Sequence, residues 1–369
     1  MRETRRRGPL FSKPGMAVVG GALALAMLAA CGSSDDDAQA SGDGSGSCES
    51  EADPVLTLAA YSNPYTAYGK ITSAFAAEWK EENDDQNLIF SASYGGSTTQ
   101  AQNIINGFEA DVYASSLTPD VGLVEDAGLV THDWQAEKDG SIVATSVVGF
   151  MVRPGNPEGI ESWEDLTKPG LEILTPDPAA SGGARWNIVA AYGAAMRGEI
   201  PGVEGNDPAA AQKYLEELFT NVTVLDKSAN DSFKNFESGN GDVAITYENQ
   251  ALAGIEAGSE SDFVIPPSTV SIQTPTVVVD ENAEKHCIED IATAFVSYLH
   301  GDEAQEVFQT TGFQRAINVS EAAKGDGDLY PPVPDLFTTD DIGGWDELAS
   351  DTVFGPEGAF TNAFAAVNG

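Results

Sequence analysis

Apolar residues along this chain recur in two alternating patterns. Residues 55–60 and 88–93 are short apolar runs typical of strands. Residues 67–80 and 98–107 follow them with apolar positions three and four apart, the spacing of a helix. The alternation continues, with strands predicted at 111–115, 142–153, 171–174, 221–225, 243–247 and 276–279 and helices at 185–197, 208–219, 232–238, 288–300 and 304–310. This order predicts α/β layers with mostly parallel strands.

A strand-to-helix junction at residues 175–186, with the sequence TPDPAASGGARW, has the residue types expected where a helix begins beside a ligand. Two prolines prevent helix formation at its start, and Ser181 is a favoured helix N-cap. Gly182 and Gly183 allow the backbone to approach another molecule closely. Free N–H groups and the positive end of a helix dipole therefore predict an anion site here. An ordinary strand-to-helix turn is the alternative.

A second junction repeats this design at residues 94–100, with the sequence YGGSTTQ. It follows the predicted strand 88–93 and precedes a helix whose apolar face carries Ala101, Ile104, Ile105 and Phe108. Neither junction has a lysine close by. Two such junctions favour binding of an anion by uncharged donors.

The first 31 residues have the composition of a targeting segment. Basic residues precede an apolar run at 16–30, which is short for a membrane span. The run ends in the sequence LAAC, which resembles a bacterial lipobox and implies cleavage before Cys31 and diacylation of its sulfur. Two acyl chains anchor a protein stably where one does not. A plain signal peptide is the alternative.

Residues 32–53 are rich in Ser, Gly and Asp and predict a flexible acidic tether. The remaining residues, 54–369, are enough for two domains with hydrophobic cores of their own. The order of regions therefore predicts a targeting segment, a tether and a folded body.

Charge narrows the possible partners. The chain has 18 basic and 58 acidic residues, a net charge of −40. Without residues 1–31 the remainder has 13 basic and 57 acidic residues and a net charge of −44. Such an excess makes nucleic acid and anionic membrane surfaces poor partners. It also repels an anionic ligand at long range, so capture has to rest on local donors.

The sequence contains none of the familiar catalytic or metal-binding motifs. There is no G-x-S-x-G, G-x-G-x-x-G, H-E-x-x-H or P-loop, and the three cysteines lack metal-ligand spacing. We therefore expect no cofactor, no bound metal and no enzymatic activity. With Cys31 lipidated, Cys48 and Cys287 are left, and outside the cytosol they are expected to form a disulfide.

Several motifs occur in an order that resembles the periplasmic sulfate-binding proteins of ABC transporters, a family with thiosulfate-binding members. The resemblance covers nearly all of residues 55–369. Its motifs are YGGS at 94–97, EADV at 109–112, RPGNP at 153–157, WEDL at 163–166, KPG at 168–170, SGGARWN at 181–187, PTV at 275–277 and GGW at 343–345.

The resemblance implies a type II periplasmic-binding-protein fold, in which two α/β lobes are joined by crossover hinge strands around a ligand cleft. We expect lobe 1 at residues 54–147 plus 271–330 and lobe 2 at 148–270 plus 331–369. It also implies an extracytoplasmic lipoprotein, monomeric and held at the membrane by its lipid anchor, that captures sulfate and delivers it to the membrane permease of an ABC importer.

Family contacts to the anion carry over residue by residue. The ligand-binding positions they imply are Asn63, Ser97, Ser181, Gly182, Gly183, Ala229 and Tyr247. We expect Arg185 to orient the Ser-Gly-Gly loop and Gln100 to support the second junction. Asp231 is expected to cap a helix that begins near Ser232, with its carboxylate away from the cleft.

Departures from the family pattern leave the ligand open. A tyrosine, Tyr247, stands where the family has a tryptophan, and Asp231 stands where it has glycine. Thiosulfate, phosphate or another tetrahedral oxyanion is therefore an alternative to sulfate. Two further alternatives are an ester hydrolase, with Asp231 or Glu248 as a base, and a sensor lobe that signals to a membrane partner.

Overall fold

The computed structural model describes residues 53–368. The predicted lipobox with Cys31, and almost all of the tether with Cys48, lie outside these residues. Cys287 is disulfide-bonded, but its predicted pairing with Cys48 stays a prediction. In the described part of the chain, no helix is both long enough and apolar enough to cross a membrane.

The described strands form one ten-stranded sheet. Eight of them follow the spatial order β2, β1, β3, β9, β4, β7, β5, β6, while β10 pairs with β9 and β8 pairs with β4. Their bounds are β1 Val55–Tyr61, β2 Ile89–Gly95, β3 Val112–Ala114, β4 Ile142–Val152, β5 Ile173–Pro176, β6 Val222–Asp226, β7 Val243–Tyr247, β8 Asp262–Val264, β9 Ser268–Val278 and β10 Asp335–Phe337.

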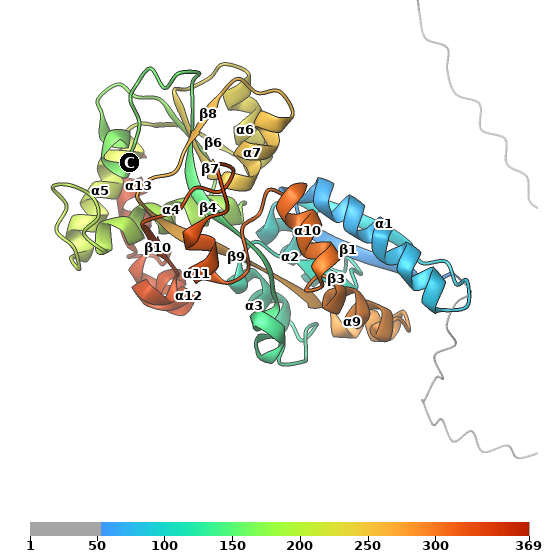
Figure 1. Ribbon diagram of the computed structural model, residues 1–369. Helices are drawn as coiled ribbons and strands as arrows, with labels where there is room; N and C mark the ends of the chain where they lie inside the picture. The colour runs from blue at the N-terminus through green and yellow to red at the C-terminus, as the bar shows by residue number, and fades with distance from the viewer. Residues whose placement is uncertain (1–52, 369) are drawn as a thin grey trace, which may run out of the picture. The chain divides into compact units, whose positions relative to one another are not determined.

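Helices cover the faces of this sheet (Figure 1). Their bounds are α1 Tyr65–Glu82, α2 Ser97–Ile105, α3 Thr118–Asp126, α4 Gly182–Met196, α5 Pro208–Thr220, α6 Ala229–Glu237, α7 Glu248–Glu256, α8 Asp280–Lys285, α9 Glu289–Tyr298, α10 Asp302–Thr310, α11 Val319–Lys324, α12 Gly344–Glu347 and α13 Ala359–Asn368. The α/β class expected from the alternating pattern is confirmed.

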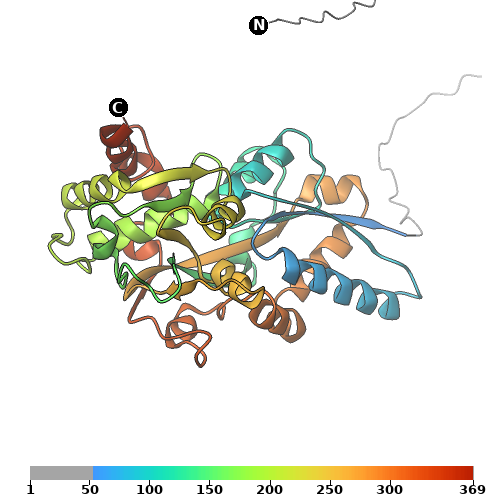
Figure 2. The ribbon, with the colours of Figure 1, turned by 90° about the horizontal axis from the view of Figure 1, so that it is seen from above.

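Parallel pairing joins β1 to β2 and β3, β5 to β6 and β7, and β10 to β9. All antiparallel pairs involve β4 or β9. These two strands have eleven residues each and are almost completely buried. They pair with each other over 142–147 and 271–275. Figure 2 shows β9 running between the two groups of helices.

The apolar residues form separate cores on either side of these long strands. One group packs α1, α9 and α10 against β1 and β3, around residues such as Phe75 and Phe295. A second group packs α4, α5 and α13 around Trp163 and Trp186. Tyr68 and Phe308 in the first group, and Phe219 and Phe360 in the second, make edge-to-face ring contacts.

Two element boundaries differ from the predictions for physical reasons. The last long strand begins at Ser268 rather than near residue 276, because its polar residues are buried and hydrogen-bonded, as when Thr274 donates to the carbonyl of Ala144. Helix α6 begins at Ala229 rather than near Ser232, because Ser228 caps it by accepting the N–H of Asp231.

Candidate functional site

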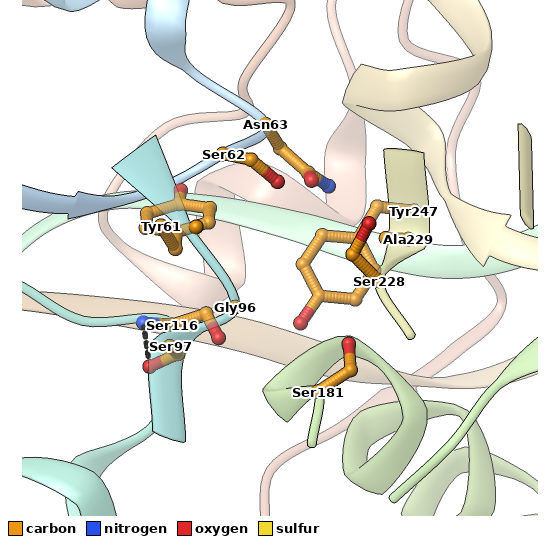
Figure 3. A pocket seen from close by; sticks show the side chains of 12 residues that line it. Tyr61, Ser62, Asn63, Gly96, Ser97, Ser116, Ser181, Ser228, Ala229 and Tyr247 are labelled. Carbon is orange, nitrogen blue, oxygen red and sulfur yellow. Dashed lines mark hydrogen bonds between the residues drawn. The ribbon is translucent and has the colours of Figure 1, made fainter. Parts of the chain in front are cut away.

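A pocket with an empty volume of about 250 Å³ lies where loops from both groups of elements meet (Figure 3). All of the residues that line it are uncharged. They are Tyr61, Ser62, Asn63, Gly95, Gly96, Ser97, Ser116, Ser181, Gly183, Ser228, Ala229 and Tyr247.

The starts of five helices surround this pocket. Gly96, Ser181, Ser228 and Tyr247 are the N-cap residues of α2, α4, α6 and α7, and Asn63 lies two residues before α1. The first N–H groups of a helix have no partner within that helix, and they carry the positive end of its dipole. Five helix starts around one small space therefore make it electrically suited to an anion without any charged side chain.

The Ser-Gly-Gly loop reaches the pocket from the end of β5. Ser181 is the N-cap of α4 but its hydroxyl caps no N–H, so it is free to face the pocket. A Cβ placed on Gly183 would lie 3.3 Å from Ser181 Oγ and 3.6 Å from Tyr247 Cε1. Gly182 does not line the pocket, because its backbone packs against Ser116.

The second Gly-Gly-Ser junction uses its serine to join the loops. Ser97 Oγ accepts the N–H of Ser116 at 3.1 Å and lies 2.8 Å from Ser115 Oγ and 3.2 Å from the hydroxyl of Tyr113. The hydroxyl is thus engaged within the protein. The backbone N–H at the start of α2 is the group of Ser97 that is left for a ligand.

Two side chains at the pocket have a buried donor atom that makes no hydrogen bond of ordinary geometry. They are Asn63, which is half-buried, through Nδ2, and Tyr247 through its hydroxyl, which lies near Ser116. Burial raises the pKa of Tyr247 well above its ordinary value, so its hydroxyl stays protonated. Figure 3 shows the Tyr247 ring lying across the pocket with the hydroxyl toward Ser116 and Ser181. Buried polar atoms in proteins rarely lack partners, so these donors indicate an acceptor that the protein itself does not supply.

The predicted supporting residues lie outside the pocket lining. Gln100 is buried and donates through Nε2 to Ser93 Oγ at 3.1 Å, which links α2 to β2. Arg185 donates through Nε to the carbonyl of Pro178 at 3.2 Å, within the Ser-Gly-Gly loop.

The prediction that Asp231 caps a helix near Ser232 is wrong, because Ser228 is the N-cap of α6. Asp231 lies in the first turn of that helix, where its carboxylate accepts a hydrogen bond from Ser228 Oγ at 2.9 Å. Its side chain is exposed and does not line the pocket.

Six of the seven predicted ligand positions line one pocket, with Gly182 beside it. Gly95 and Gly96 belong to the second predicted junction, whereas Tyr61, Ser62, Ser116 and Ser228 had no predicted role in binding. Ser116 follows β3 and Ser228 follows β6, so the available signal was a small polar residue shortly after a strand. Which strand ends lie together at one edge of the sheet depends on the strand order, and one sequence does not reveal that order.

The chemistry that the pocket offers is binding. Its lining has no carboxylate, histidine, cysteine or lysine. Among residues 53–368, no cluster of three potential metal ligands occurs. The groups present are N–H and O–H donors, which suit an anionic ligand.

Comparisons with known proteins agree with this site. The sequence model of the family described as bacterial extracellular solute-binding protein matches residues 56–314. A sulfate-binding protein of Synechococcus elongatus is 38% identical over 318 residues, which are 85% of this chain and 87% of that protein. A sulfate-binding protein of Salmonella typhimurium is 40% identical over 304 residues, which are 81% of this chain and 90% of that protein.

A more distant relative is a thiosulfate-binding protein of Escherichia coli. It is 29% identical over 296 residues, which are 79% of this chain and 85% of that protein. Among solved structures, the sulfate-binding protein SubI from Mycobacterium tuberculosis has a TM-score of 0.71 and 33% identity. That match covers 80% of this chain and 98% of SubI. This chain therefore belongs to the sulfate-binding protein family of bacterial extracellular solute-binding proteins.

Proposed function

We propose that this protein captures sulfate outside the cytoplasm for an ABC importer. The observation that carries the proposal is the pocket itself, in which five helix starts meet around unpartnered donors on Tyr247 and Asn63. Sulfate is fully ionised at neutral pH and can only accept hydrogen bonds. A lining of N–H and O–H donors, with no carboxylate, suits such a ligand.

Uncharged donors are sufficient for useful affinity. A hydrogen bond to a charged group contributes roughly 1.5–3 kcal/mol, so six of them supply about 9–18 kcal/mol before desolvation costs. Micromolar binding requires only about 8 kcal/mol. The pocket therefore needs no lysine or arginine in contact with the anion.

The remaining features of the proposal follow from the same family membership and from the N-terminal sequence. We infer that diacylated Cys31 anchors the protein to the membrane, that the tether leaves the folded body free, and that the body acts as a monomer with a membrane permease as its partner. We propose that the two largest cores belong to the two lobes, with β4 and β9 as the hinge strands between them.

Sulfate is preferred over two related anions on separate grounds. The thiosulfate-binding protein of Escherichia coli is less similar, at 29% identity, than the sulfate-binding proteins of Synechococcus elongatus and Salmonella typhimurium, at 38% and 40%. Monohydrogen phosphate has a proton to donate and gains most from an acceptor carboxylate, which the pocket lining lacks. The lining also lacks an acid or base for ester hydrolysis.

Titration calorimetry of the purified protein against sulfate, thiosulfate, phosphate and molybdate tests this function. We expect sulfate to bind most tightly, and Tyr247→Phe to weaken its binding by about tenfold or more, the worth of one hydrogen bond to a charged group. Removing an unpartnered buried hydroxyl is also expected to leave the ligand-free protein no less stable.

A matched control is Tyr192→Phe. Tyr192 is also buried with an unpartnered hydroxyl, but it lies outside the pocket lining. Equal loss of affinity in both variants would contradict the assignment of the pocket. Absence of sulfate binding in the unmodified protein would refute the proposed function.

A further inference from the structure

A buried carboxylate lies directly beside the pocket-lining Tyr247. Glu248 is the first residue of α7, and none of its surface is exposed. A negative charge at this place opposes the binding of an anion in the pocket next to it. An acid in the first turn also offsets part of the positive helix end that favours the anion. The pocket lining supplies no cation that could compensate.

Arg315 compensates this charge from outside the pocket. Its Nε donates to one oxygen of Glu248 and its Nη2 to the other, both at 2.6 Å. The arginine is 3% exposed. Two of its remaining N–H groups are used as well, because Nη1 donates to the carbonyl of Ala322 at 2.7 Å and Nη2 to that of Pro331 at 2.8 Å. The guanidinium is thus held in one orientation by three different parts of the chain.

The segment that carries Arg315 connects the two sides of the pocket. The preceding residue, Gln314, donates to the hydroxyl of Tyr61 at 3.1 Å, and Tyr61 lines the pocket on the side of the first core. The backbone N–H of Arg315 donates to the carbonyl of Thr145 on β4 at 2.9 Å. Adjacent residues of one segment therefore support Tyr61 on one side and the helix start after Tyr247 on the other.

We propose that Arg315 is a positioning residue for anion capture: it serves as the buried counter-ion of Glu248, keeps the start of α7 free of net negative charge, and thereby sets the affinity of the pocket although it does not touch the ligand. The proposal rests on the oxyanion-binding function proposed above. It makes two opposite predictions: removing the cation should weaken binding of the anion, and removing the carboxylate should not weaken it.

The expected size follows from Coulomb's law. With an effective dielectric constant of about 20, an unpaired charge in the vicinity of a dianion weakens binding by about tenfold or more, depending on separation. Burial raises the pKa of Glu248 more than the contacts with Arg315 lower it, so the net shift is upward. Of the described residues, the ionisable groups that interact with Glu248 are Arg315 and Tyr330, and burial raises the pKa of Tyr330, which stays neutral. Without Arg315, acid would therefore neutralise Glu248.

Four forms of the full protein test this proposal by calorimetry with sulfate at pH 8 and pH 5.5. The unmodified protein is compared with Arg315→Gln, Glu248→Gln and the variant with both substitutions. We expect Arg315→Gln to bind about tenfold more weakly or worse at pH 8, with recovery at pH 5.5. We expect Glu248→Gln to bind at least as tightly as the unmodified protein, and the double variant to return to within a few-fold of it.

A purely structural ion pair gives a different result. If the pair only held the fold together, both single variants would lose affinity, and acid would restore neither; that outcome overturns the proposal. If Arg315→Gln does not fold, the Glu248→Gln variant alone decides. Sulfate binding equal to or tighter than that of the unmodified protein would support the proposal, and weaker binding would contradict it.

Arg197→Gln provides the matched control. Arg197 makes a comparable two-bond pair with Asp335 away from the pocket, and its removal is expected to leave sulfate affinity unchanged. If the unmodified protein bound no oxyanion, the proposed function would fail. If it bound sulfate and Arg315→Gln left the affinity unchanged, only the counter-ion role would fail.

Discussion

A single methyl group at Gly96 should interfere with capture while leaving the fold intact. Gly96 has φ −65° and ψ 137°, an extended conformation that alanine adopts without strain. Its backbone lies against the loop that precedes α4, and a Cβ there would be 2.6 Å from the carbonyl oxygen of Ala180. The clash is therefore between the start of α2 and the Ser-Gly-Gly loop, on opposite sides of the pocket.

The cost can be worked out from this distance. Real Cβ contacts are seldom closer than 3.4 Å, so the two loops have to separate by about 0.8 Å. Overpacking of this kind costs about 1–3 kcal/mol. Where this contact forms as the pocket closes on its ligand, that cost falls on binding, and the Gly96→Ala variant should bind sulfate roughly 5- to 150-fold more weakly.

Calorimetry and thermal unfolding together test this reasoning. We expect the ligand-free melting temperature to stay close to that of the unmodified protein, while the rise in melting temperature on adding sulfate becomes smaller. Gly69→Ala is the control, because a Cβ there meets nothing within 4 Å. Unchanged sulfate affinity in Gly96→Ala would refute the reasoning. A large loss of stability without ligand would show that the contact belongs to the fold itself.

Two further predictions concern charge. Burial lowers the pKa of His286, but hydrogen bonds with Asp111 at 2.6 Å and Glu109 at 3.1 Å outweigh it, and the net shift is upward. The stability gained from these bonds is therefore complete below about pH 6.5 and is lost as the pH rises through the raised pKa of His286 in the folded protein. The His286→Gln variant should lower the melting temperature more at pH 6 than at pH 8.5. A loss of melting temperature that is independent of pH would contradict this. Asp231→Asn should leave the preference for sulfate over phosphate unchanged in competition binding, since this exposed carboxylate faces Ser228; an inverted preference would place it at the ligand.

Local patterns in the sequence were sufficient to predict the strands and helices whose ends are marked by glycine, proline or helix-capping residues. The strand–helix order around both Gly-rich junctions is confirmed, as is the strand Val243–Tyr247. Helix α7 was not predicted, and its first residue, Glu248, is held by a distant arginine. Such a tertiary contact has no signature in the local sequence.

In the candidate site, too, some residues could be identified from the local sequence and others could not. Ser181 and Gly183 were identifiable, because their residue types match a helix start near an anion. Ser116 was not, because it gains its place only when β3 ends beside the N-terminus of α2, where its N–H donates to Ser97. Pairing between strands far apart in the chain decides which small polar residues meet, and one sequence does not reveal that order.

The first core also has a consequence for how the protein is made. It joins Leu56 and other early residues to Phe295 and Phe308, which follow only after the middle stretch that supplies most of the second core. Helix α9 begins 175 residues after the end of β3 at Ala114. At ribosomal rates of about 5–20 residues per second, β1 and β3 wait roughly 9–35 s for the helices that complete their cover. Most of the second core comes from the stretch between β4 and β9, which can begin to pack first, although Phe337 and α13 complete that core only at the end of the chain. The early strands stay partly uncovered until α9 and α10 have been made.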